Sequence, residues 1–212
     1  NLTLDRLILT PLSIRAEIFL RISHCLLSPR EHMDEVTRVY SIPQVLAQCQ
    51  GWLRANLPHR VLIEADSTAA AARRVREEGD GAAIGSRLAA AHYGLHILAE
   101  GIEDNPSNTT RFLVVGEGES TMTGRDKTSL LFGTPHTPGA LYDALEPFAK
   151  RQINLMKIES YPVKERLWEY LFFVDFAGHG EDEEIKKCMD DLRRKTTFLK
   201  ILGSYPRGED AR

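Results

Sequence analysis

The feature that most constrains the fold of this chain is an alternation of apolar and other side chains over residues 168–176. Every even-numbered position in this stretch is aromatic or valine, whereas Glu169 and Asp175 occupy odd-numbered positions. Successive side chains of a strand point to opposite faces of its sheet, so one face of this segment is continuously apolar. The pattern predicts a strand over residues 167–177 that places one face on a core.

The segments around this strand predict a complete small domain. Apolar runs indicate further strands over 128–133, 153–160 and 197–204, and helices are expected from Gly139 to Phe148 and over 181–195. The second helix has acidic residues in its first turn and basic residues in its last, which suits the helix dipole. The resulting βαββαβ order is that of a ferredoxin-like sandwich. We expect this domain to occupy residues 128–205, with 206–212 as a tail.

Residues 1–116 show a different pattern, in which short strands alternate with helices. Strands are predicted over 14–22, 36–40, 61–65, 82–85, 95–99 and 111–116, and helices over 43–56, 69–78 and 86–93. Ser41 is a candidate N-cap for the first helix, and Asp66, Ser67 and Thr68 precede the second. The alternation indicates an α/β layer structure. The polar, glycine-containing residues 117–127 are predicted to form a linker.

Composition excludes several classes of function. The 212 residues are 42% hydrophobic and 27% charged with a net charge of −3, an ordinary globular balance that argues against binding to a phosphate backbone. No apolar run reaches the roughly 18–20 residues of a membrane span. Cys25, Cys49 and Cys188 are scattered. We therefore expect neither a metal site nor disulfides, and the cysteine usage favours the cytoplasm.

Three polar clusters are candidates for chemistry, and each has a structural alternative. In the segment 108–112, Arg111 could grip a carboxylate while a threonine donates to a leaving oxygen, or the segment could be a simple turn. The polar residues near Ser41 and Ser67 could bind an anion at helix N-termini or serve only as caps. His24 and Cys25 are adjacent on a strand and are expected to face opposite sides, which argues against a joint nucleophilic role.

These residues resemble the prephenate dehydratase family with its C-terminal ACT regulatory domain. The matching segments run through most of the chain: HCLLS at 24–28, the S-x-P-Q-x-x-x-Q pattern at 41–48, STA at 67–69, AAIGS at 82–86, DNPSNTTRF at 104–112, PGAL at 138–141, INLMKIES at 153–160 and WEYLFFVD at 168–175. The resemblance implies an α/β fold in which part of a two-lobed, type II periplasmic-binding-protein-like catalytic domain, residues 1–116, precedes the ACT domain. Asn1 aligns just after the opening lobe of the family, so we expect residues 1–116 to be mostly second lobe.

The resemblance also implies an activity and a site. The family converts prephenate to phenylpyruvate in phenylalanine biosynthesis, a lyase reaction that releases carbon dioxide and water and is driven by aromatisation without a cofactor. The implied catalytic residues are Thr110, as hydrogen-bond donor to the departing hydroxyl, and Arg111, as partner of a substrate carboxylate. The implied substrate-binding residues are Ser41, Gln44, Gln48, Asp66, Ser67, Thr68, Asn108 and Phe112.

In the ACT part, the resemblance implies a sensor for phenylalanine that inhibits by feedback and self-associates as a dimer or tetramer. The implied effector-binding residues are Gly139, Ala140, Leu141, Asn154, Glu159 and Ser160. Two positions depart from the family pattern. In the ACT part, Tyr161 stands where the family's Glu-Ser-Arg-Pro motif has arginine. In the catalytic part, Ile42, within the S-x-P-Q-x-x-x-Q pattern at 41–48, stands where the family has histidine.

Two other interpretations are carried forward. The chain could be a non-catalytic amino-acid-sensing protein, or the C-terminal part of a bifunctional chorismate mutase/prephenate dehydratase. The intact Thr110-Arg111-Phe112 motif favours an enzyme as the parent protein. Because much of one lobe is expected to lie upstream, we expect the 212 residues alone to bind a ligand through the ACT domain and to show little catalysis.

Overall fold

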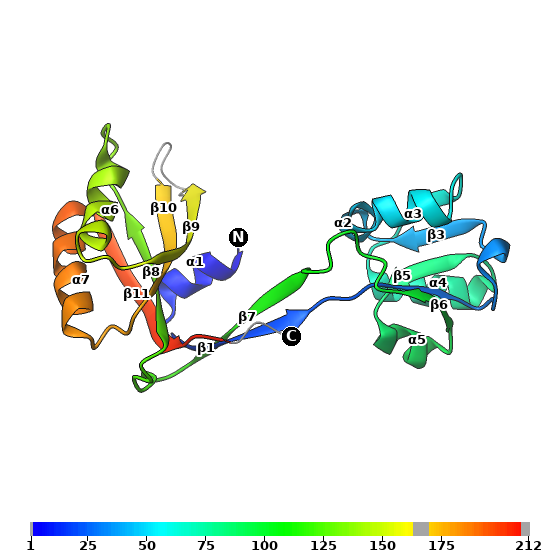
Figure 1. Ribbon diagram of the computed structural model, residues 1–212, viewed down its shortest axis with the longest axis horizontal. Helices are drawn as coiled ribbons and strands as arrows, with labels where there is room; N and C mark the ends of the chain where they lie inside the picture. The colour runs from blue at the N-terminus through cyan, green and yellow to red at the C-terminus, as the bar shows by residue number, and fades with distance from the viewer. Residues whose placement is uncertain (1, 163–169, 209–212) are drawn as a thin grey trace. The chain divides into compact units, whose positions relative to one another are not determined.

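The computed structural model describes residues 2–162 and 170–208, which form two compact units (Figure 1). Unit 1 combines residues up to 19 with those from 111 onward, and unit 2 contains residues 20–110. Strands β1 (Ser13–Arg21) and β7 (Thr109–Gly116) pair as a two-stranded sheet, and both run across the division between the units.

Unit 1 contains the predicted βαββαβ domain. Its elements are β8 (Asp126–Gly133), α6 (Ala140–Lys150), β9 (Leu155–Pro162), β10 (Tyr170–Ala177), α7 (Glu183–Lys195) and β11 (Phe198–Pro206). The strands form an antiparallel sheet in the order β11-β8-β10-β9, which confirms the ferredoxin-like fold. The predicted strand position Trp168 lies outside the described residues.

Both faces of this sheet are covered. On one face, Phe172, Val174 and Phe176 pack with α6 and α7, as the alternation predicts. On the other face, Phe173 belongs to a second apolar cluster with Leu7 of helix α1 (Leu2–Leu9) and Ile14 of β1. The sequence pattern predicted a single buried face. It missed the second because the covering segments lie more than a hundred residues away along the chain.

Gly203 of β11 shows how closely β1 approaches the sheet. A Cβ atom at this position would lie 2.2 Å from the carbonyl oxygen of Ile14. Only a residue without a side chain permits that backbone contact.

Unit 2 is a three-layer α/β/α structure. Its elements are β2 (Cys25–Ser28), the short 3₁₀ helix η1 (Met33–Glu35), β3 (Arg38–Ser41), α2 (Pro43–Gln48), α3 (Gln50–Asn56), β4 (Val61–Glu64), α4 (Thr68–Glu78), β5 (Ala82–Gly85), α5 (Arg87–Tyr93) and β6 (His96–Glu100). The strand order is β4-β3-β5-β2-β6, with β3 parallel to β4 and β5, and β2 antiparallel to its neighbours. Helices α2 and α3 cover one face, and α4 and α5 cover the other.

Two predictions about the first helix of this unit are wrong. The predicted single helix over 43–56 is broken at Cys49 into α2 and α3. The break is stabilised by Asp104, whose carboxylate accepts hydrogen bonds from the N–H groups of Gly51 and Trp52 at 2.8 and 3.0 Å. Ser41 is also not the N-cap, a position held by Ile42. The buried Ser41 hydroxyl instead donates to the carbonyl of Ile84 at 3.0 Å.

The predicted linker region contains no regular structure over residues 117–125, and β8 begins at Asp126. The division between the compact units falls elsewhere, at 19/20 and 110/111.

Candidate functional site

One edge of the unit 2 sheet gathers most of the predicted substrate-binding residues. The carboxyl ends of the parallel strands β3, β4 and β5 lie at this edge, each followed by a helix. Ligands of open α/β sheets bind at such edges, where helix N-termini offer unpaired N–H groups. Strand β2 begins at the same edge, because Cys25 pairs with Gly85 at the end of β5. We call this region the carboxyl edge.

Gln48 and Asn108 line one cavity of about 220 Å³ at the carboxyl edge. The cavity is also lined by Ala47, Glu103, Asp104 and Asn105. The structure thus brings together two predicted residues from different motifs and adds two acids that the sequence did not single out. The signal in the sequence was the position of Glu103, three residues after the end of β6 at this edge.

The remaining predicted residues of unit 2 have varied surroundings. Ser67 is the N-cap of α4, and its hydroxyl accepts from the N–H of Ala70 at 3.0 Å. Gln44 and Asp66 are exposed at the starts of α2 and α4, and Thr68 is half-buried. The Ser41 hydroxyl is fully enclosed, so it shapes the edge through Ile84 rather than facing a ligand.

The thiols near this edge are not nucleophiles at neutral pH. Burial, followed by the charges of Asp104 and Glu103, raises the pKa of Cys49 to about 12. Burial also raises the pKa of Cys25, which packs against the α4/α5 layer. His24 instead contacts Gln48 of α2, so the prediction that His24 and Cys25 face opposite sides is confirmed.

The two predicted catalytic residues are assigned to different units. Thr110 is exposed in β7 and ends unit 2, whereas Arg111 begins the returning part of unit 1. The guanidinium of Arg111 pairs with two protein carboxylates: Nε lies 2.7 Å from Glu17, and Nη1 lies 2.5 Å from Asp175. Nη2 donates to the hydroxyl of Tyr205 at 2.7 Å.

These contacts belong to a buried cluster inside unit 1. Lys127 is the second cation, and it pairs with Glu17, so two cations face two carboxylates. Burial opposes the charge of Arg111, but Tyr205, Asp175 and Glu17 outweigh it and raise its pKa. In this structure the guanidinium therefore already pairs with two protein carboxylates, and a substrate carboxylate would compete with them. Phe112, the third residue of the motif, is 49% exposed.

The predicted effector residues divide into two groups within unit 1. Gly139, Ala140 and Leu141 line an open cavity of about 420 Å³ formed by residues 134–142 at the start of α6. Glu159 and Ser160 are adjacent and exposed on β9, one of the two edge strands of this sheet, so their side chains point to opposite faces of the sheet. Asn154 precedes β9, and its carbonyl accepts from the N–H of Ala177 at 3.0 Å.

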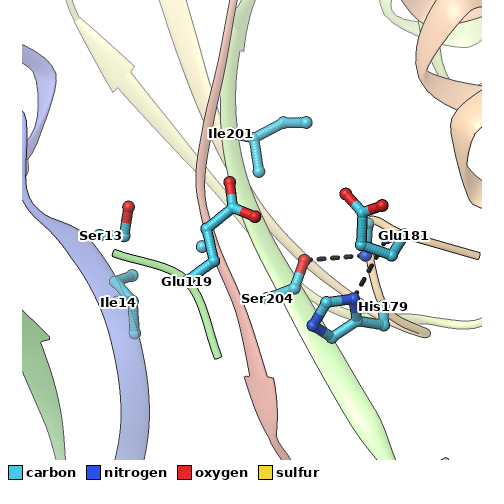
Figure 2. Close-up of a pocket in the computed structure, with 9 residues that line it drawn as sticks. Ser13, Ile14, Glu119, His179, Glu181, Ile201 and Ser204 are labelled. Carbon is cyan, nitrogen blue, oxygen red and sulfur yellow. Dashed lines mark hydrogen bonds between the residues drawn. The ribbon is translucent and has the colours of Figure 1, made fainter. Parts of the chain in front are cut away.

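A further cavity of about 160 Å³ in unit 1 contains none of the predicted residues (Figure 2). His179 and Ser204 line it, and they accept hydrogen bonds from the N–H groups of Glu181 and Gly180 at 3.1 and 2.9 Å. These polar groups satisfy the turn between β10 and α7.

Within residues 2–162 and 170–208, no cluster of three or more histidine, cysteine or acidic side chains is arranged to hold a metal ion. Of the helices described, none is long and apolar enough to cross a membrane.

Comparison with known proteins identifies two domain families in the chain. Residues 1–120 match the family model of prephenate dehydratase, and residues 128–194 match that of the ACT domain. The bifunctional chorismate mutase/prephenate dehydratase of Aquifex aeolicus is 47% identical over 207 residues, which cover 98% of this chain and 57% of that protein. The chain thus spans less than two thirds of this relative.

Two solved structures are similar over nearly the whole chain. The prephenate dehydratase of Arthrobacter aurescens, determined in complex with L-Phe, has a TM-score of 0.86 and 35% identity, covering 97% of this chain and 70% of that one. A structure described as GqqA, a novel type of quorum quenching acylase, has a TM-score of 0.79 and 34% identity, covering 92% and 72%. With the family model matching more than half of its residues, the chain belongs to the prephenate dehydratase family.

Proposed function

We propose that this chain carries the second-lobe part of a prephenate dehydratase active site together with a phenylalanine-sensing ACT domain. The observation that carries the proposal is the cavity at the carboxyl edge, which joins Gln48 and Asn108 from two separate family motifs. In the complete enzyme, prephenate loses carbon dioxide and its ring hydroxyl and becomes phenylpyruvate.

The chemistry asks little of the protein beyond position and hydrogen bonding. Aromatisation of the ring provides the driving force, so the site must hold a dianion and assist departure of a hydroxyl. The N-terminus of α4, capped by Ser67, supplies a favourable field for an anion. Thr110 is a weak acid, and we assign it a hydrogen bond to the departing oxygen, while the proton that completes the released water comes from solvent. Neutral thiols at Cys25 and Cys49 fit a mechanism without a covalent intermediate.

We assign Arg111 to a substrate carboxylate by exchange of partners. A bidentate carboxylate of the substrate would replace Asp175 or Glu17 on the guanidinium. A protein carboxylate released in this way would change the charge balance of the unit 1 cluster, so exchange links the Thr110-Arg111-Phe112 motif to strands of the ACT domain.

The fold alone does not decide the activity, because one similar structure is described as an acylase. The Thr110-Arg111-Phe112 motif and the Gln48–Asn108 cavity favour the dehydratase. The test is formation of phenylpyruvate from prephenate, followed by absorbance in alkali, with release of the acyl group from an N-acylated compound as the rival reaction. Phenylpyruvate formation by the chain, or by the natural protein that contains it, supports the proposal. Release of the acyl group without phenylpyruvate would overturn it.

We further propose that phenylalanine binds at the cavity formed by residues 134–142. Gly139 precedes α6 with a φ of +83° and lines this cavity without a side chain that would fill it. The L-Phe complex of the Arthrobacter aurescens enzyme supports an amino-acid effector. Calorimetric titration with phenylalanine tests this assignment. Absence of binding heat at millimolar ligand, with a folded ACT domain, would contradict it.

Self-association through the ACT domain and a cytoplasmic location complete the proposal. Strand β9 ends the sheet of unit 1, so one of its edges has backbone groups available for a second copy. All three cysteines are buried and unpaired, as in a reducing compartment. Light scattering after size exclusion measures the first property, and a protein that is monomeric with and without phenylalanine would contradict it.

A further inference from the structure

His24 lies next to Gln48 at the carboxyl edge and shares a hydrogen bond with it. The Nε2 atom of His24 is 3.0 Å from Oε1 of Gln48. An amide oxygen can only accept, so Nε2 must carry the hydrogen in this arrangement. His24 is 6% exposed, whereas Gln48 lines the cavity. The histidine therefore contacts the side-chain amide of Gln48 but does not line the cavity itself.

The backbones of both residues are fixed by one segment, residues 102–104. The N–H of Ile102 donates to the carbonyl of His24 at 3.1 Å, and a carboxylate oxygen of Glu103 accepts from the N–H of His24 at 2.8 Å. The N–H of Asp104 donates to the carbonyl of Gln48 at 2.8 Å. Three consecutive residues thus set the separation of His24 and Gln48, and neither can shift alone without losing a hydrogen bond.

The contact with His24 also determines which end of the Gln48 amide is available. With Oε1 bound, the NH₂ group is the end left for a ligand, and in the described part of the chain it makes no hydrogen bond of its own. Without His24, rotation of the amide by 180° would present an acceptor as readily as a donor. Gln48 is therefore polarised as a donor toward the cavity.

We propose that His24 is a positioning residue that orients Gln48 to donate a hydrogen bond to a neutral oxygen, hydroxyl or keto, of the bound substrate. A carboxylate at this point would meet the charges of Glu103 and Asp104, which line the same cavity. A hydroxyl or keto oxygen accepts from the amide without that repulsion. This inference rests on the proposed function, because it names a role within the same site.

Enzyme kinetics with five variants of the natural protein that contains this chain test the proposal. His24→Ala is expected to lower kcat/KM for prephenate about 10-fold, the effect of one hydrogen bond. His24→Gln, which keeps an amide donor near the Nε2 position, is expected to restore most of this loss. The double variant His24→Ala/Gln48→Ala should be no worse than Gln48→Ala, since the histidine acts only through the glutamine. His96→Ala, at an exposed position of the same unit, serves as the control.

Multiplication of the two single effects in the double variant would overturn the proposal, as would wild-type kinetics in His24→Ala. Nitrogen NMR of the unmodified chain gives a readout that needs no turnover. We expect the Nε2–H tautomer of His24 and a Gln48 side-chain amide signal that shifts in His24→Ala but not in His96→Ala. An Nδ1–H tautomer, or an unmoved amide signal, would refute the arrangement. If the chain gives the expected spectrum but the natural protein that contains it forms no phenylpyruvate, only the proposed function is contradicted.

Discussion

The ammonium group of Lys127 lies 2.8 Å from both carboxylate oxygens of Glu17, whose side chain has no exposed area. The same carboxylate pairs with Arg111 and accepts from the N–H of Gly208 at 2.9 Å. Together with Asp175, these side chains form a buried cluster of two cations and two anions. Such a cluster is stable only while its charges balance, because an unpaired buried ion is costly.

The first prediction concerns this balance. Glu17→Gln removes one negative charge and leaves two buried cations facing one carboxylate. We expect it to lower the free energy of unfolding of unit 1 by about 3 kcal/mol. The double variant Glu17→Gln/Lys127→Met removes one charge of each sign and should recover part of that loss. Calorimetric unfolding measures both. Equal stability of Glu17→Gln and the wild type would show that the cluster carries no net stabilisation.

The charge cluster also illustrates what the sequence could and could not predict. The alternation around Phe172 and Val174 reveals the strand and its helix-facing side, because that information is local. Glu17, Lys127 and Asp175 come from three strands whose register the sequence does not specify. The sequence therefore could not predict that these side chains form ion pairs with one another and with Arg111. The sequence-based prediction assigned Arg111 wholly to a ligand.

A similar limit applies to the carboxyl edge. The motif around Ser67 predicts a capped helix correctly, since capping depends on neighbouring residues. The break at Cys49 was not predicted because Asp104, more than fifty residues further on, caps α3. The family motifs bring Gln48 and Asn108 into consideration one at a time. Only the fold shows that they share a cavity with Glu103.

The second prediction separates capping from substrate binding at Ser67. Ser67 and Ser86 cap α4 and α5 in the same way, accepting from backbone N–H groups at 3.0 and 3.2 Å. Replacing either by alanine should cost about 1 kcal/mol of stability. If Ser67 also meets the substrate, only Ser67→Ala should raise KM for prephenate beyond what reduced folding explains. Equal kinetics in the two variants would restrict Ser67 to a capping role.

The third prediction uses two glycines to isolate the effector site. Gly139 and Gly79 both have positive φ, at +83° and +68°, and a Cβ atom at either would meet no other atom within 4 Å. Gly139→Ala and Gly79→Ala should therefore carry a similar backbone strain, about 1 kcal/mol. We expect only Gly139→Ala to weaken phenylalanine binding, measured by calorimetry. Matching affinities in the two variants would move the effector away from the start of α6.

The fourth prediction is a dependence of stability on pH. Hydrogen bonds from Lys150 and Lys195 lower the pKa of Glu146 from 4.5 to about 2. A carboxyl group with a lowered pKa stabilises the fold above its unfolded pKa, and that contribution disappears as the pH falls from 4.5 toward 2. Glu146→Gln should flatten the decline of stability in this window, and salt should weaken the effect in the wild type. Glu183→Gln, whose side chain is 80% exposed, is the control. Chemical unfolding at several pH values provides the measurement, and identical slopes in all three proteins would contradict the prediction.

The fifth prediction concerns Thr110 in β7. Thr109 and Thr110 are neighbouring exposed hydroxyls on the same strand, but only Thr110 matches the threonine of the family motif. Thr110→Ala should lower kcat by about 10²–10⁴-fold while prephenate binding is retained, because the hydroxyl stabilises the departing oxygen mainly in the transition state. Thr109→Ala removes a hydroxyl of the same strand one position earlier. It should leave kcat within about 2-fold, which corresponds to a change in activation free energy of less than about 0.5 kcal/mol. Single-turnover kinetics and direct binding of prephenate, measured on the natural protein that contains this chain, distinguish the two steps. Loss of binding with unchanged turnover of bound substrate would assign Thr110 to substrate capture and leave the departing hydroxyl to another donor.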